Sequence, residues 1–241
     1  MRDNQTILAY LQVTAHTRPF LASCYERIEN RRASQHAYNN AERFIYGLNL
    51  GDEYLQSSLH TPLSVQPLLL YYSLTHYLKS LLLTVDPGYP ATAKVLAHGL
   101  STRKRKRQHY RFLEDDIRIQ PNGLFPYAAR HLFAFETTEE KVSMDELLRP
   151  LPFMSWIYEY KNLQTDSTGE PWPELLAHFA ILYNLSMLVR YEGEWWGEME
   201  QLRDRDDYVF ITQFLKESSN RIPLLIAEWL KGQFHQSGLE N

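Results

Sequence analysis

Residues 65–85, which read VQPLLLYYSLTHYLKSLLLTV, decide the fold of this chain. The segment is apolar on nearly all sides, and helices of that kind lie at the centre of a bundle with other helices around them. His76 and Lys79 interrupt the apolar run, and Asp86-Pro87 closes it. Those interruptions favour a buried helix of a soluble protein over a membrane span. We therefore expect a helical bundle organised around this central helix.

Helical periodicity extends through most of the remaining chain. Apolar residues recur at helical spacing over about 18–31, 36–48, 173–190, 207–217 and 221–232. A length of 241 residues suffices for one continuous core. We expect a single, mainly α-helical domain spanning residues 1–241.

The region of about 86–136 differs from the rest, because prolines and glycines are frequent from Asp86 to Gly123. Within it, residues 116–127 read DIRIQPNGLFPY, in which short apolar stretches flank a Pro-Asn-Gly turn. That pattern predicts a small β-hairpin. We expect a loop-rich insertion that carries this hairpin, set into the helical bundle.

Composition limits the possible functions. The formal net charge of −4 argues against a nucleic-acid coat over the whole surface, so anion binding must come from a local patch. Cys24 is the only cysteine, which fits a reducing compartment. The N-terminus lacks the apolar core of a signal peptide, so we expect a cytoplasmic protein. Nucleotide-loop, dinucleotide and His-Glu-x-x-His motifs do not occur, and we predict no cofactor and no metal site.

A basic segment, residues 103–107, is the sharpest local signal. Adjacent cations repel one another and gain stability when they neutralise phosphate, which arginine binds through two parallel hydrogen bonds. The alternative is an intramolecular ion-pair network with Glu114, Asp115 and Asp116 downstream. Both interpretations stay open at this stage.

Two cations outside that segment join the candidate ligand site. Lys79, in the central helix, either reaches the surface along its stem or meets a carboxylate or a ligand. Arg190 ends a helix, where capping alone would explain a cation, and the alternative is an arginine that faces a ligand. The predicted ligand-binding residues are His98, Arg103, Lys104, Arg105, Lys106, Arg107, Lys79 and Arg190.

Four segments of the chain resemble, in this order, the motif series of the bacterial YaaC-like protein family. They are PLSVQPLLLYYSLTHYLKSLLLTVDPGYP (62–90), VLAHGLSTRKRKRQ (95–108), QPNGLF (120–125) and VRYEGEWW (189–196). In relatives the gene is often found near that for IMP dehydrogenase. The resemblance therefore implies a connection with purine metabolism and makes IMP dehydrogenase a candidate partner.

The central helix and VRYEGEWW are also similar to HEPN-superfamily domains, which include ribonucleases, nucleotide-binding modules and scaffolds. This resemblance implies a HEPN-like bundle and a homodimer. HEPN ribonucleases use an arginine to stabilise phosphate and a nearby histidine to handle a proton. Here Arg31 and His36 are separated by four residues, and Arg103 and His109 by five. Both pairs are candidates for such a site.

We therefore expect a non-catalytic binding or regulatory protein. Its basic segment 103–107 would engage a phosphate-bearing ligand, such as a nucleotide or RNA, or an acidic protein surface. One alternative is a metal-independent ribonuclease of the HEPN type. The other is a structural adaptor that holds a partner protein through aromatic side chains such as Trp195 and Trp196.

Overall fold

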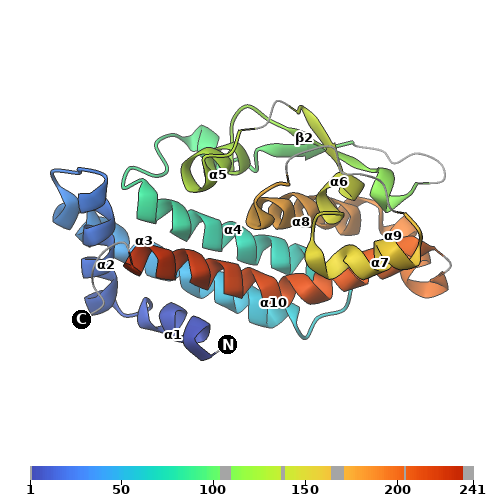
Figure 1. Cartoon of the computed structure of the whole chain (residues 1–241), viewed down its shortest axis with the longest axis horizontal. Helices are drawn as coiled ribbons and strands as arrows, with labels where there is room; N and C mark the ends of the chain where they lie inside the picture. The colour runs from blue at the N-terminus through green and yellow to red at the C-terminus, as the bar shows by residue number, and fades with distance from the viewer. Residues whose placement is uncertain (1, 104–109, 137–138, 164–170, 204, 236–241) are drawn as a thin grey trace.

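The computed structural model describes residues 2–103, 110–136, 139–163, 171–203 and 205–235. The chain is mainly α-helical, with one small antiparallel sheet (Figure 1). Its elements are, in order, α1 (Arg2–Tyr10), α2 (Thr14–Arg27), α3 (Ala33–Ser58), α4 (Gln66–Val85), η1 (Ala93–Leu96), β1 (Leu100–Thr102), η2 (Phe112–Glu114), β2 (Asp116–Ile119), α5 (Leu124–Phe133), β3 (Lys141–Ser143), α6 (Met144–Leu148), η3 (Pro152–Met154), α7 (Ser155–Tyr160), α8 (Glu174–Tyr191), α9 (Gly193–Leu202) and α10 (Asp206–His235).

Helix α4 is the central helix that the sequence predicts, and its bounds match the prediction. Pro67 lies in its first turn, where the missing backbone N–H costs nothing, and an extended Asp86 ends it. Helices α3, α8, α10, α5 and α2 pack against it. Helix α3 approaches closely at Gly51, whose carbonyl accepts a hydrogen bond of 2.7 Å from the Ser73 hydroxyl. A Cβ at Gly51 would lie 2.6 Å from the Tyr77 ring, so this contact requires glycine.

Helix α10 corrects one prediction. The sequence predicts two helices over 207–217 and 221–232, whereas the structure has one continuous helix with Pro223 inside it. Proline removes one backbone hydrogen bond from a helix and crowds the preceding turn. Ile222, Ile226 and Leu230 are fully buried on one face of α10 on either side of that point. Their burial offsets the lost bond, because most helical stability comes from packing of the apolar face.

The β insertion is present, but its strand pairing differs from the predicted hairpin. Strand β2 pairs with β1 and with β3, both antiparallel, in the order β1-β2-β3. Leu124 and Phe125, expected in the second strand of a hairpin, instead begin α5. Pro126 lies in the first turn of α5, a position that suits proline and that a strand interior would not tolerate.

Two glycines bring the start of β1 against the start of α5. Gly99 has φ of 80° and Gly123 has φ of 132°, values that favour glycine. A Cβ on Gly123 would lie 2.4 Å from the Gly99 Cα, so the two backbones touch. The N–H of Leu124 donates to the Ala97 carbonyl at 2.7 Å, and that of Phe125 to the His98 carbonyl at 3.1 Å. These contacts hold the backbone of His98 in a fixed position.

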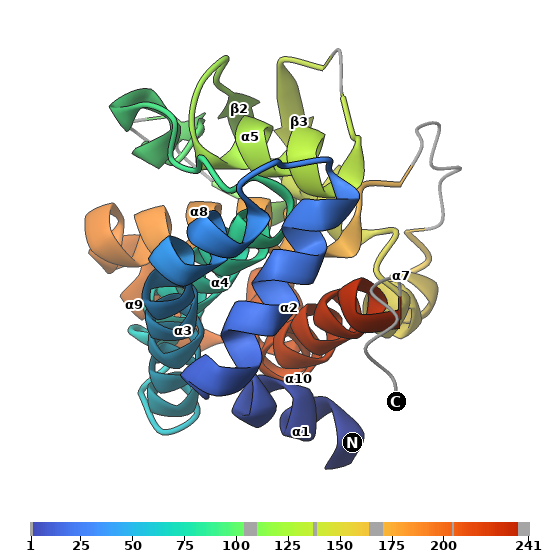
Figure 2. The same ribbon diagram turned by 90° about the vertical axis from the view of Figure 1, so that its left-hand side faces the viewer.

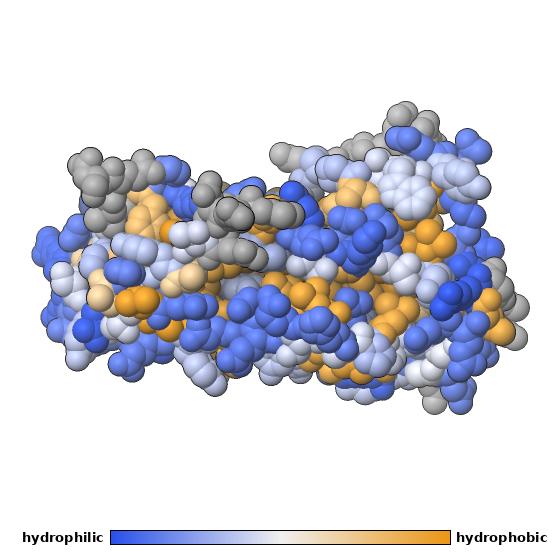
Figure 3. Space-filling model, turned by 90° about the horizontal axis from the view of Figure 1, so that it is seen from below, coloured by the Kyte–Doolittle hydropathy of each residue, from blue (hydrophilic) through white to orange (hydrophobic). Residues whose placement is uncertain are grey.

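The molecule has two layers. Figure 2 shows α5, β2 and β3 together above the helices, with α4 and α8 beneath them. The opposite face, seen from below in Figure 3, carries separate apolar patches among polar side chains. None of the helices in the described part of the chain has the length and apolar character needed to cross a membrane.

Candidate functional site

His98 lies against tyrosines from two helices. Its Nδ1 is 2.6 Å from the Tyr71 hydroxyl of α4, a hydrogen-bond distance. Its ring centroid is 5.5 Å from that of Tyr71 and 5.6 Å from that of Tyr183 on α8. Tyr71 is buried, and burial raises the pKa of its hydroxyl, which therefore keeps its proton at neutral pH. The histidine is exposed, so its ring is oriented by the protein and open to solvent.

The charges of Arg190 and Lys79 both act on His98. Burial lowers the pKa of His98, and the charges of Arg190 and Lys79 lower it further. Burial also lowers the pKa of Lys79. Among the described residues, no carboxylate lies within ion-pair distance of any of these three side chains. We call Lys79, His98 and Arg190 the cation row.

Arg190 is only partly engaged with its own helix. Its Nε donates to the Ser186 carbonyl at 2.9 Å, and its guanidinium lies 5.4 Å from the centre of the exposed Tyr191 ring. The Nη1 group makes no hydrogen bond within the described chain. The helix end thus fixes one edge of the guanidinium, and the other edge remains able to donate to a ligand.

The basic segment is only partly described. Arg103 pairs with Asp116 at 3.3 Å, which is the intramolecular contact that the sequence left open. Asp115 is buried and accepts hydrogen bonds from the Tyr110 hydroxyl and the Asn184 amide, each at 2.8 Å. Glu114 pairs with Arg111 at 3.7 Å. The predicted residues Lys104, Arg105, Lys106, Arg107 and His109 lie outside the described residues.

The Arg31–His36 pair lies apart from the cation row in the fold. Arg31 is exposed in the turn before α3, and His36 is in the first turn of that helix. The Nδ1 of His36 is 3.0 Å from the Asn30 amide nitrogen. Neither residue belongs to α4, to α8 or to the loop before β1, which carry the cation row.

The proposed aromatic adaptor surface is largely buried. Trp196 is 2% exposed, and Trp195 is half-buried against the Tyr110 ring at 4.8 Å between centroids. The two tryptophans therefore serve packing around α9. Trp156 and Tyr160 of α7 are exposed instead, at 50% and 80%.

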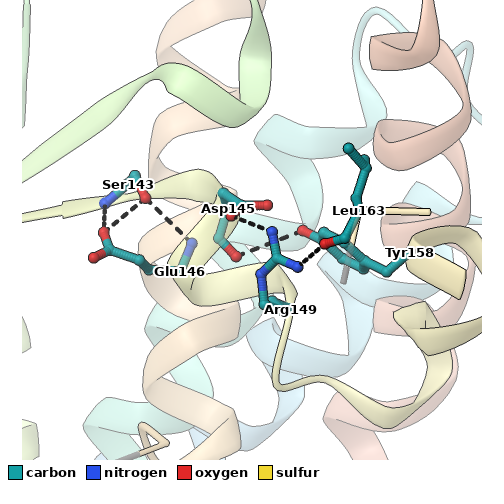
Figure 4. A network of polar contacts seen from close by, with 6 residues as sticks. All are labelled: Ser143, Asp145, Glu146, Arg149, Tyr158 and Leu163. Carbon is teal, nitrogen blue, oxygen red and sulfur yellow. Dashed lines mark hydrogen bonds and ion pairs between the residues drawn. The ribbon is translucent and has the colours of Figure 1, made fainter. Parts of the chain in front are cut away.

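A cavity of about 680 Å³ forms a second charged region, between the segment around η2, α6 and the start of α10. Arg149, which directly follows α6, lines it and pairs with Asp145 at 2.6 Å. The same guanidinium donates to the Leu163 carbonyl and lies 4.5 Å from the centre of the Tyr158 ring (Figure 4). Lys161 pairs with Asp206, another lining residue, at 2.5 Å. The charges of these pairs are compensated within the protein.

Helix α6, which precedes Arg149, has a side-chain cap at its N-terminus. Ser143 and Glu146 form a reciprocal capping box at the start of α6, in which the Ser143 hydroxyl accepts from the Glu146 N–H at 3.2 Å (Figure 4). Ser143 also ends β3, so the sheet passes directly into this helix. Such a cap fixes where the helix begins.

A serine–histidine–glutamate line inside the bundle escaped the sequence analysis. The Ser218 hydroxyl is 3.0 Å from Nδ1 of His178, and Nε2 of His178 is 3.5 Å from Glu174. Burial opposes ionisation of Glu174, yet hydrogen bonds from His178 and Arg221 lower its pKa to about 2. Ser218 and His178 are fully buried, so no substrate reaches them. The line joins α8 to α10, and its spacing across 40 residues leaves no local sequence signal.

The fold is that of a mainly α-helical protein with a small antiparallel sheet inserted after its central helix. A profile of the YaaC-like protein family matches residues 9–168 and 159–230. The chain therefore belongs to the YaaC-like protein family. No curated protein matches the chain. No solved structure matches it either.

Proposed function

We propose that this chain is a non-catalytic binding or regulatory protein that engages a phosphate-bearing ligand, a nucleotide or RNA. The observation that carries the proposal is the cation row, in which Lys79, His98 and Arg190 gather without a carboxylate in ion-pair contact among the described residues. The positive charges of Arg190 and Lys79 disfavour the protonated form of His98. An anionic ligand would offset that effect, and phosphate matches the hydrogen-bonding geometry of a guanidinium.

The three side chains offer different contacts to one phosphate group. Arg190 supplies a planar fork, and Lys79 supplies a compact charge. His98 is held by Tyr71 and by the backbone contacts around Gly99. A site whose cations are positioned before the ligand arrives loses less conformational entropy on binding.

The basic segment is proposed to extend the same site. Only β1 separates His98 from Arg103, the first residue of the segment. Arg103 is paired with Asp116, an exposed contact that a phosphate can exchange for its own. An acidic protein surface is the other partner that this segment suits, and IMP dehydrogenase remains a prediction from the family resemblance.

Calorimetric titration with inorganic pyrophosphate tests the proposal. We expect saturable binding that weakens as salt rises, because exposed ionic contacts are screened. Arg190→Ala should weaken binding strongly, whereas Lys216→Ala, which removes an exposed cation of α10, should leave it unchanged. Equal effects of the two variants, or no heat at all, would show that the cation row is not an anion site.

A second candidate is the metal-independent ribonuclease. It is supported by the electrostatic effect of Arg190 on His98 and by the Tyr71 hydroxyl, which is 2.6 Å from Nδ1 of that histidine. A positioned histidine and a phosphate-stabilising cation are the groups that RNA cleavage requires. Incubation with a labelled RNA oligonucleotide tests it: turnover lost in His98→Ala but kept in His36→Ala would support cleavage at this site. If the unaltered protein binds the RNA and does not cleave it, the ribonuclease function is excluded and the binding function remains.

A further inference from the structure

A row of rings adjoins the cation row. Tyr54 of α3 stacks on His76 of α4, with centroids 5.6 Å apart and ring planes 10° from parallel. The ring centroid of Tyr54 also lies 5.7 Å from that of Tyr72. All three rings are half-buried, so part of each is in contact with solvent. We call Tyr54, Tyr72 and His76 the ring platform.

The ring platform is continuous with the cation row. The ring centroid of Tyr72 lies 5.8 Å from that of Tyr71, whose hydroxyl is within hydrogen-bond distance of His98. At its other end, His76 lies within electrostatic range of Lys79. A partly exposed group of aromatic rings thus lies beside the cation row, whose members have no carboxylate partner in the described chain.

The platform lies at the half-exposed side of the contact between α3 and α4. Ser73, Tyr77 and Ser80 of α4, which also contact α3, are buried. Tyr72, His76 and Lys79 are spaced four and three residues apart, so they form a separate stripe along α4. That stripe flanks the helix contact and is half-exposed along its length.

We infer that the ring platform stacks the base of a nucleoside phosphate whose phosphate groups lie on the cation row. The inference rests on the proposed function and narrows its ligand to one that has an aromatic base. Stacking on tyrosine and histidine depends on the π-face that every base has. The platform would therefore discriminate by ring size, and a purine should bind more tightly than a pyrimidine.

Titrations of the full chain with ATP, CTP and inorganic triphosphate test the inference, because the three share the phosphate chain. We expect ATP to bind about tenfold more tightly than triphosphate, the size of one stacking contact, with CTP between them. Tyr54→Leu should weaken ATP about tenfold and leave triphosphate unchanged. Tyr54→Phe, which keeps the ring, should preserve both affinities.

A matched control is Tyr46→Leu, which removes a tyrosine of the same helix that is 65% exposed. It should change neither affinity. If ATP binds no more tightly than triphosphate, or if Tyr54→Leu weakens both equally, the base has no place on the platform. If triphosphate and ATP both fail to bind, the proposed function fails as well, which is a distinct result.

One measurement needs no substitution, in case Tyr54→Leu does not fold. Adenosine, which lacks phosphate, should compete with ATP at millimolar concentration because it occupies the ring platform. It should not compete with triphosphate, which reaches only the cation row. Absence of competition with ATP would overturn the inference.

Discussion

The cation row and the cavity beside α6 are both rich in charge, but they differ in how that charge is balanced. In the cavity, Arg149 has a carboxylate at 2.6 Å, a carbonyl and a ring as partners. In the cation row, Lys79 and His98 have lowered pKa values and no carboxylate in ion-pair contact within the described chain. Removing one partner of a partly buried pair leaves the other charge uncompensated and costs stability, whereas a charge without a carboxylate partner has no such pair to lose.

The largest effect is expected in the cavity. Arg149→Met should lower the free energy of unfolding by about 2–4 kcal/mol, because it leaves Asp145 and the Leu163 carbonyl without their donor. The Arg149 side chain is only 16% exposed, so water replaces it poorly. Urea unfolding measures the change. Arg111→Met is the control, since this 73% exposed cation should matter by less than about 0.5 kcal/mol. Equal losses of stability in both variants would show that paired Arg149 contributes no more to the fold than exposed Arg111.

Arg190→Ala should lower ligand affinity and leave the free energy of unfolding nearly unchanged. We expect pyrophosphate affinity to fall about tenfold to a hundredfold, the range for a lost charge-assisted hydrogen-bonding group. The free energy of unfolding should change by less than about 1 kcal/mol, because Arg190 is exposed and no carboxylate pairs with it in the described structure. Titration and urea unfolding of the same preparation give both numbers. A destabilisation as large as that of Arg149→Met would assign Arg190 to the fold.

Lys79→Met should change stability in the opposite direction from Arg149→Met. The methionine keeps the length of the stem and removes a half-buried charge, so the free energy of unfolding should rise by about 0.5–1 kcal/mol. Anion affinity should fall in the same variant. Thermal and urea unfolding without ligand decide the sign. A destabilised Lys79→Met would mean that the charge contributes to folding.

The smallest effect is a dependence of affinity on pH. The folded-state pKa of His98 is lowered below 6.5, so the ring is mostly neutral at pH 7. A bound anion favours the charged ring and raises that pKa, so binding takes up a proton. Affinity should therefore rise a few-fold as pH falls through the lowered pKa. Calorimetry in buffers of different ionisation enthalpy measures the uptake, and His98→Gln should abolish it. Proton release on binding would contradict the model of a neutral, anion-accepting histidine.

The central helix was predictable because its signal is local. Residues 65–85 are apolar around the whole helix, and their bounds agree with α4 within one residue. The pairing of β2 was not predictable, because a Pro-Asn-Gly sequence specifies a turn and leaves the type of the next element open. The contact between Gly99 and Gly123 directs the chain into α5, and no local pattern reveals that contact.

For the candidate site too, the sequence reveals the individual residues but not their grouping. Lys79, His98 and Arg190 are each conspicuous in the sequence, since each is a cation in or beside a strongly patterned segment. Their grouping depends on α4, α8 and the loop before β1, which are far apart along the chain. Tyr54 carried no signal at all, because a single tyrosine on a helix is ordinary until its neighbours across the helix pair are known.

The sequence by itself determined the helical class, the central helix, the family and the identity of the cations. Those properties depend on periodicity and residue chemistry, which act over a few residues. Only the tertiary structure decided which charges are paired and which are not, because pairing depends on distances between elements that fold together. Arg149 and Arg190 are equivalent as sequence, and only the structure shows that Arg149 has a carboxylate partner, whereas Arg190 has none among the described residues.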